Sequence, residues 1–280
     1  MEVRANCKVN VGLRVKRRRE GGYHEIETLF YPVYGLYDLL DVEKAEDGSS
    51  VGRTADREGN PQIALTTSGI VVDCNADDNL IVKAYRRMAA MYEQVGSVRV
   101  HLDKRVPFGA GLGGGSSDAA HLVMAVNTLF GLGLTKEQMA EAVRPIGADC
   151  PFFIYNTPCM AKGIGDVLSP ADFSWKGKRM VMVKPPVSVS TKEAYAGIRL
   201  HDEPLDLRVN DFEETVFARY PLLGRVKQTL LEAGAEYAAM SGSGSVVYGV
   251  FEQDSERGSL PLDRLIDKDL ASMIIFDDTL

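Results

Sequence analysis

The hydrophobic and polar positions of this chain alternate between two periods, one of two residues and one of three to four. From Ala5 to Val15, apolar residues alternate strictly with polar ones, which is typical of a strand with one buried face. We predict further strands at residues 27–34, 39–45, 62–68, 98–103 and 178–186, a polar hairpin at 46–60, and a strand–glycine turn–strand unit at 235–251.

The longer period predicts helices in the segments between these strands. In the first helix, apolar residues share one face, and the helix is expected to end at Gly96. Thr135 and Gln138 are spaced as a capping box, in which each side chain satisfies a backbone N–H of the other residue. The helices predicted in this way span residues 78–96, 116–130, 135–143 and 220–234.

Strands and helices are mixed without a regular strand–helix–strand rhythm, which predicts an α+β fold rather than a doubly wound parallel sheet. A chain of 280 residues has room for one large domain or two ordinary ones. We expect a domain boundary near residues 155–160, which divides the chain into residues 1–157 and 158–280. The basic run at 16–19 predicts an exposed turn.

Composition narrows the class of partner. The 32 basic and 39 acidic residues give a net charge of −7, which argues against a broad nucleic-acid or membrane surface. The sequence has no apolar run of 18 residues and no signal-peptide pattern, so we expect a cytoplasmic protein. Its four cysteines lack metal-ligand spacing, and we expect buried free thiols in a reducing compartment.

The stretch PFGAGLGGGSSDAA, residues 107–120 and here named the glycine loop, has five glycines between positions 109 and 115. So many residues without side chains suggest that the backbone binds a ligand closely. A dinucleotide fingerprint would need an acidic residue after a second strand, and a Walker loop would need a lysine. A purely structural turn would need fewer glycines. The favoured interpretation is an anion cradle at a helix N-terminus, with Ser116 and Ser117 capping the helix and Mg²⁺ and distant cations compensating charge.

This loop resembles the phosphate loop of the GHMP kinase superfamily. The sequence departs from the family pattern at Cys150, in the stretch GADCPFF, where Val or Ile is expected. The resemblance extends over about residues 5–252 and narrows to the 4-diphosphocytidyl-2-C-methyl-D-erythritol kinases of the non-mevalonate isoprenoid pathway. The other stretches that carry it are Lys8 to Asn10 (KVN), GGYHEIETLF at 21–30, GADCPFF at 147–153, PPVSVSTKEAY at 185–195, and MSGSGSVVYGVF at 240–251, which matches the superfamily's third glycine motif.

The resemblance implies a two-domain α+β GHMP kinase fold with the active site in the cleft between the domains. It implies ATP- and Mg²⁺-dependent phosphorylation of the 2-hydroxyl of a cytidine-diphosphate-linked substrate, by a monomer or homodimer. Two alternatives stay open: a kinase of another small alcohol such as homoserine or mevalonate, and a non-catalytic sensor. The YHEIETLF stretch disfavours the first, and the presence of Lys8 and Asp149 disfavours the second.

By the same resemblance, Asp149 is the catalytic base, and Lys8 stabilises its charge and the developing alkoxide. Lys8 and Asn10 are two residues apart on a strand, so they share a face. We expect Tyr23 and Tyr195 to sandwich the cytosine while His24 reads its edge. The nucleotide-binding residues expected are Asn79, Lys104, Pro107, Gly109, Gly111, Leu112, Gly113, Gly114, Gly115, Ser116 and Ser117. The substrate-binding residues expected are Asn10, Tyr23, His24, Asp149, Tyr195, Gly242, Ser243 and Gly244, and the metal ligands are left open.

Overall fold

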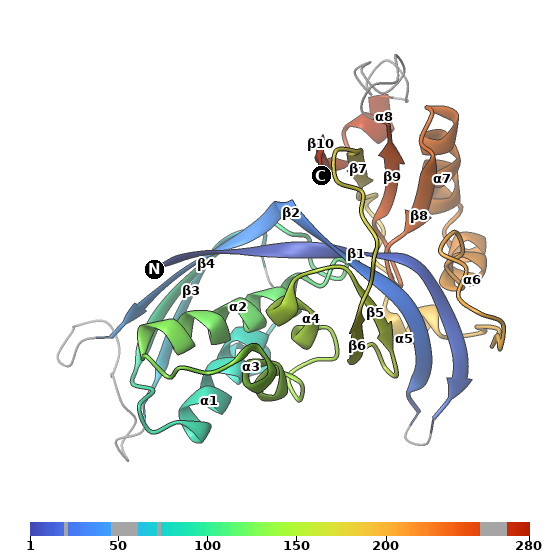
Figure 1. The fold of residues 1–280 in the computed structure, drawn as a ribbon. Helices are drawn as coiled ribbons and strands as arrows, with labels where there is room; N and C mark the ends of the chain where they lie inside the picture. The colour runs from blue at the N-terminus through green and yellow to red at the C-terminus, as the bar shows by residue number, and fades with distance from the viewer. Residues whose placement is uncertain (20–21, 46–60, 72–73, 253–267) are drawn as a thin grey trace. The chain divides into compact units, whose positions relative to one another are not determined.

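Two long N-terminal strands, β1 (Glu2–Arg18) and β2 (His24–Lys44), pair with each other (Figure 1) and contribute to both units of the protein. The computed structural model describes residues 1–19, 22–45, 61–71, 74–252 and 268–280. Unit 1 contains residues 1–7, 36–108 and 113–157, and unit 2 contains residues 8–35, 109–112 and 158–280. The glycine loop therefore supplies residues to both units.

Over its described residues, unit 1 contains part of a sheet, four α-helices and one short 3₁₀-helix. The C-terminal half of β2 pairs antiparallel with β4 (Val98–Lys104), which pairs parallel with β3 (Ile63–Gly69). Alternate residues of β4 are buried, as the two-residue period predicts. Helix α2 packs against the other three helices. The remaining elements are η1 (Ala76–Asp78), α1 (Leu80–Met91), α2 (Gly114–Leu129), α3 (Lys136–Val143) and α4 (Cys150–Tyr155).

Unit 2 contains the N-terminal half of β2, β5 and β6, and a separate antiparallel sheet in the order β10–β7–β9–β8. Helix α7 packs against β8 and β9, and Leu13 and Val15 of β1 join the same apolar core. The elements are β5 (Cys159–Lys162), β6 (Val167–Pro170), β7 (Arg179–Val183), α5 (Thr191–Ala194), α6 (Phe212–Arg219), α7 (Pro221–Glu232), β8 (Tyr237–Met240), β9 (Val247–Phe251), α8 (Lys268–Ala271) and β10 (Ile274–Thr279).

The α+β prediction is confirmed, and so is the capping box of Thr135 and Gln138. The predicted strands 27–34 and 39–45 are one continuous strand, β2. Pro32 lies within β2, between the segment that pairs with β5 and the segment that pairs with β4. The missing N–H of the proline therefore costs no hydrogen bond to either strand.

Other boundaries differ from the sequence-based expectation. The basic residues from Lys16 to Arg18 continue β1 instead of forming a turn, because Lys16 and Arg17 pair with Glu27 and Glu25 across the strands. Helix α1 ends at Met91, before Gly96. The hairpin predicted at 46–60 lies outside the described residues. Within the described part of the chain, none of the helices has the length and apolar character needed to cross a membrane.

Candidate active site

Motifs that are far apart in the sequence converge on Gly111 in unit 2. Its carbonyl oxygen accepts hydrogen bonds from Lys8 Nζ at 3.0 Å and from the Ser241 hydroxyl at 2.8 Å. Gly111 has φ of +77°, and a Cβ at this position would lie 1.9 Å from the Ser241 carbonyl oxygen. Only glycine fits here, because both the backbone angle and the close approach exclude a side chain. The glycine loop, the K-x-N motif and the third glycine motif thus meet at one residue.

The Lys8 ammonium is buried and closely held. It donates a hydrogen bond to Asn10 Oδ1 at 2.5 Å and lies 4.9 Å from the centre of the Phe30 ring. Asn10 Nδ2 donates in turn to Thr28 Oγ1 at 3.1 Å, which fixes the orientation of the amide. The contact confirms that Lys8 and Asn10 share a strand face. A cation and an amide are therefore pre-positioned beside the carbonyl of Gly111.

The third glycine motif is positioned by a residue that sequence reasoning missed, Asn210. Its buried side-chain amide donates hydrogen bonds to the carbonyl oxygens of Met240 at 2.7 Å and Gly242 at 2.8 Å. A Cβ on Gly242 would lie 3.1 Å from Asn10 Oδ1, so little space separates the two motifs. No local period or motif marks Asn210 in the sequence, because both of its partners lie about 30 residues further along the chain.

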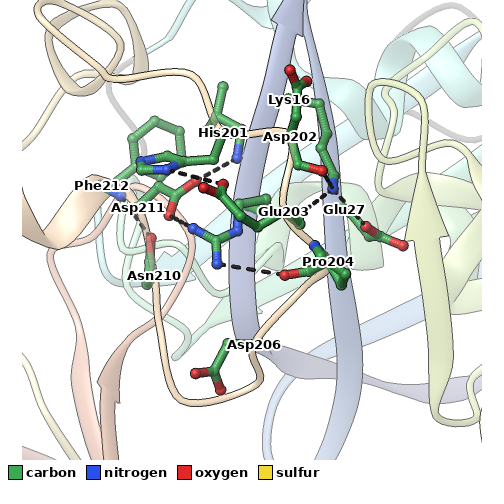
Figure 2. Close-up of polar contacts among 12 residues, drawn as sticks. Lys16, Glu27, His201, Asp202, Glu203, Pro204, Asp206, Asn210, Asp211 and Phe212 are labelled. Carbon is green, nitrogen blue, oxygen red and sulfur yellow. Dashed lines mark hydrogen bonds and ion pairs between the residues drawn. The ribbon is translucent and has the colours of Figure 1, made fainter.

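Asn210 is held in turn by a segment, residues 201–212, that is tied to β1 (Figure 2). The His201 N–H donates to the Val15 carbonyl at 2.9 Å, and Lys16 Nζ donates to the Glu203 carbonyl at 2.5 Å. The buried carboxylate of Asp211 accepts hydrogen bonds from the Val15 N–H at 2.7 Å and from the Arg14 guanidinium at 3.1 Å. These bonds hold the backbone on either side of Asn210 in a fixed position relative to β1.

In unit 1, helix α2 begins at Gly114, and its N-cap is Gly113 in the left-handed conformation, with φ of 71°. No side chain caps the helix. The prediction that Ser116 and Ser117 cap it is wrong, because the helix starts earlier and places both serines inside its first turn. The Ser117 hydroxyl is buried and donates to the Asn6 carbonyl at 2.6 Å. The first N–H groups of α2 therefore face no capping side chain, an arrangement that favours an anion.

A cavity of about 230 Å³ in unit 1 brings together three predicted nucleotide-binding residues, Asn79, Lys104 and Gly115. Asn79 is also the N-cap of α1, and its Oδ1 accepts a hydrogen bond from the Ile81 N–H at 2.9 Å. Leu80, Leu102 and Phe108 supply apolar lining. An apolar wall with a few polar groups suits a flat, polar-edged ring such as a nucleobase.

Lys104, the last residue of β4, is buried between Asp38 and Asp118. The ammonium donates to both carboxylates, and the bond to Asp118 Oδ2 measures 2.9 Å. Burial alone would lower the pKa of Lys104, but the two carboxylates raise it overall. Burial raises the pKa of Asp118 to about 8, although Lys104 opposes this shift. Two carboxylates sharing one buried cation favour protonation of one of them.

Asp149, the predicted catalytic base, occupies the N-cap position of α4 and is half-buried. Its side chain makes no capping hydrogen bond to the helix. The next residue, Cys150, is buried, and burial raises the pKa of its thiol to about 12. Cys150, which stands in place of the Val or Ile expected there, is therefore un-ionised, so it adds no charge beside the Asp149 carboxylate.

The aromatic residues expected to bind the cytosine lie in unit 2. The rings of His24 and Tyr195 are stacked, with centroids 4.3 Å apart and planes 12° from parallel. Tyr195 also contacts Phe212 edge-on, with ring centroids 4.8 Å apart. Tyr23 is 63% exposed. In this arrangement the imidazole covers one face of Tyr195, and the proposed sandwich of the base between Tyr23 and Tyr195 stays a prediction.

The cysteines depart from expectation at one position. All four are free, and Cys7, Cys150 and Cys159 are buried as predicted, but Cys74 is exposed. Cys74 lies just before η1, in a stretch of the sequence rich in aspartate and asparagine. Over the ranges that the structure describes, no three His, Cys, Asp or Glu side chains gather into a metal-binding cluster.

Comparison with known proteins relates both halves of the chain to kinases. The family described as GHMP kinases N terminal domain matches residues 79–157, and the family described as GHMP kinases C terminal matches residues 197–260. A 4-diphosphocytidyl-2-C-methyl-D-erythritol kinase of Bacteroides thetaiotaomicron is 40% identical over 270 residues, which cover 91% of this chain and 93% of that protein.

Solved structures show the same relationship. A crystal structure of 4-(cytidine 5'-diphospho)-2C-methyl-D-erythritol kinase matches with a TM-score of 0.76 and 31% identity, covering 98% of this chain and 96% of that one. A homoserine kinase from Cytophaga hutchinsonii matches with a TM-score of 0.65 over 99% of this chain and 94% of that one. Its identity is only 15%, so this second likeness shows the fold alone.

Proposed function

The chain belongs to the 4-diphosphocytidyl-2-C-methyl-D-erythritol kinases of the GHMP kinase superfamily, and we propose that it transfers the terminal phosphoryl group of ATP to the 2-hydroxyl of 4-diphosphocytidyl-2-C-methyl-D-erythritol. One observation carries the proposal most directly. Lys8 and Ser241 converge on Gly111, so a buried cation and a hydroxyl lie on the glycine loop that would hold the phosphates.

The nucleotide is proposed to bind through two features of unit 1. Its phosphates would meet the N–H groups at the start of α2, where Gly113 is the N-cap and no side chain competes. Its base would enter the 230 Å³ cavity lined by Asn79, Lys104 and Asp118. Asp118 Oδ1 is buried and has no hydrogen-bond partner among the described residues, which fits a ligand that supplies one.

Phosphoryl transfer depends mainly on positioning and charge stabilisation. We propose that the substrate hydroxyl oxygen attacks the terminal phosphorus while Asp149 accepts the hydroxyl proton. The bond from that phosphorus to the oxygen of the departing ADP breaks in the same step. The role proposed for Lys8 is to stabilise the negative charge that develops on the reacting oxygens, since its ammonium is already oriented by Asn10 and Gly111.

Mg²⁺ is proposed as the counter-ion of the nucleotide. The described residues hold no carboxylate cluster that could form a cage for it. This fits the usual behaviour of Mg²⁺ in kinases, where phosphate oxygens and water supply most of the ligands. When bound, the ion would neutralise charge on the transferring phosphoryl group.

The cytidyl end of the substrate is proposed to bind at Tyr23, His24 and Tyr195. The stacked pair of His24 and Tyr195 already presents parallel aromatic faces, and exposed Tyr23 follows Gly22, whose φ of +84° turns the chain. Base stacking contributes about 1–3 kcal/mol, and hydrogen bonds to the base edge supply discrimination.

An assay of ADP release tests the proposed function. The purified protein receives ATP and Mg²⁺ with the cytidyl substrate, homoserine or mevalonate in parallel reactions. We expect turnover with the cytidyl substrate only. Turnover with homoserine or mevalonate alone would replace the substrate assignment, and absence of turnover with all three would support a sensor instead. The Lys8→Met variant serves as the inactive control, because it removes the cation but keeps an apolar stem of similar length.

A further inference from the structure

Cys74 lines the same 230 Å³ cavity as Asn79 and Asp118. It is the one exposed cysteine of the four in the chain. An exposed side chain that also lines a cavity lies where the cavity meets solvent. The thiol is therefore accessible to reagents from outside and adjacent to whatever occupies the cavity.

A second observation marks this cavity as a ligand site. The carboxyl group of Asp118 is nine-tenths buried and lines the cavity, yet only its Oδ2 is bonded, to Lys104. Its Oδ1 has no hydrogen-bond partner among the described residues. Buried polar atoms are nearly always paired in native proteins, so this oxygen indicates that a ligand completes the cavity.

We propose that Cys74 is a covalent modification site whose occupation excludes the nucleotide from this cavity. The inference rests on the proposed function, which places the nucleotide base beside Asp118. The reacting partner is a low-molecular-weight disulfide. The Cys74 thiolate attacks one sulfur of that disulfide, the new S–S bond forms as the old one breaks, and the second sulfur leaves as a thiolate that takes up the proton lost by Cys74.

Selectivity follows from burial. Thiol–disulfide exchange requires access to the attacking sulfur as well as a thiolate. Cys7, Cys150 and Cys159 are buried, and the raised pKa of Cys150 keeps its thiol un-ionised. A disulfide reagent therefore reaches Cys74 first in the folded protein. The attached group then projects from the cavity wall into the space that the ligand needs.

The test uses the full chain in its native state, with oxidised glutathione as the modifying reagent and intact-mass measurement of the products. We expect one added glutathionyl group, located at Cys74 by peptide mapping. With ATP at 100 times its Kd, only about one molecule in a hundred is free, so the modification rate should fall about 100-fold. The modified protein should lose ATP binding by calorimetry, and reduction with dithiothreitol should restore it.

The Cys74→Ser variant is the matched control, since it keeps the size of the side chain but not its reactivity. Its ATP affinity, measured before and after glutathione treatment, should be the same. An unchanged modification rate in saturating ATP would overturn the inference while leaving the proposed function intact. So would modification that leaves ATP affinity unaltered. If the unmodified protein bound no ATP, the proposed function itself would fail, and this inference would fail with it.

Discussion

The imidazole of His24 stacks on the phenol of Tyr195, with centroids 4.3 Å apart. The two residues belong to different sequence motifs, one at the start of β2 and one just after α5. Burial, and then the positive charge of Arg18, lower the pKa of His24, which favours the neutral imidazole. A neutral imidazole has one N–H donor and one acceptor nitrogen, which is the set needed to read the edge of a pyrimidine.

Replacing His24 should therefore affect the cytidyl substrate and not the nucleotide. We expect His24→Ala to raise the KM for the cytidyl substrate and to erode its preference over a uridyl analogue, with ATP affinity unchanged. Kinetics with both substrates and calorimetry with ATP measure the two effects. His201→Ala is the control, because His201 is another partly exposed histidine of unit 2, in the segment 201–212. If His24→Ala separates the two substrates as well as the parent protein does, the pyrimidine site lies elsewhere.

Asp149→Asn should remove the proposed catalytic base without disturbing the fold. The asparagine keeps the size of the side chain and most of its capacity for hydrogen bonding. Turnover should fall by about 10²–10⁴-fold, the usual contribution of a general base. Steady-state kinetics measure the fall, and an unchanged thermal transition controls for folding. Turnover within a few-fold of the parent value would remove Asp149 from the mechanism.

Gly113→Val should weaken ATP binding more than its effect on stability explains. Gly113 has φ of 71°, so a valine costs at least about 1–2 kcal/mol of folding free energy in addition to blocking the start of α2. Gly131→Val is a matched control, because Gly131 has φ of 62° at the other end of the same helix and open space around it.

Both glycine variants should lose similar amounts of unfolding free energy in urea, while only Gly113→Val should lose ATP affinity in calorimetry. Equal ATP affinity in the two variants would reduce the glycine loop to a structural turn.

The buried cluster of Lys104, Asp38 and Asp118 predicts an asymmetry between two substitutions. Lys104→Met leaves two buried carboxylates without their cation and should cost about 3–5 kcal/mol of unfolding free energy. Asp118→Asn keeps the shape and leaves the pair of Lys104 with Asp38 intact, so near pH 7 it should cost about 1 kcal/mol or less. Urea unfolding of both variants measures the difference, and equal losses would contradict this description of the cluster.

The same cluster predicts a pH dependence with a definite sign. The pKa of Asp118 rises from an unfolded value of 3.8 to about 8 in the folded protein, so the folded state binds more protons between these values. Its contribution to stability is therefore present at low pH and is lost as the pH rises toward and through 8. The unfolding free energy of the parent protein minus that of Asp118→Asn should be larger at pH 6 than at pH 9. A difference that grows with pH instead would contradict the assignment.

Much of this protein follows from local sequence physics. The alternation from Ala5 to Val15 is sufficient to predict a strand, and the spacing of Thr135 and Gln138 is sufficient to predict a capping box, because each pattern is satisfied within a few residues. The density of glycines at 109–115 marks a place where backbone must come close to something. The motifs also identify the kinase family, since they keep their residues and order along the chain.

Only the tertiary structure decided which distant residues meet. Asn210 orients the third glycine motif, and Asp38 and Asp118 share the charge of Lys104. Position 111 must be a glycine because the Ser241 carbonyl oxygen occupies the space that a side chain would need. No period along the chain encodes these contacts, because each depends on how separate strands and helices pack. The exposure of Cys74 has the same origin: burial is set by what covers a residue, and that is decided when the elements around it come together.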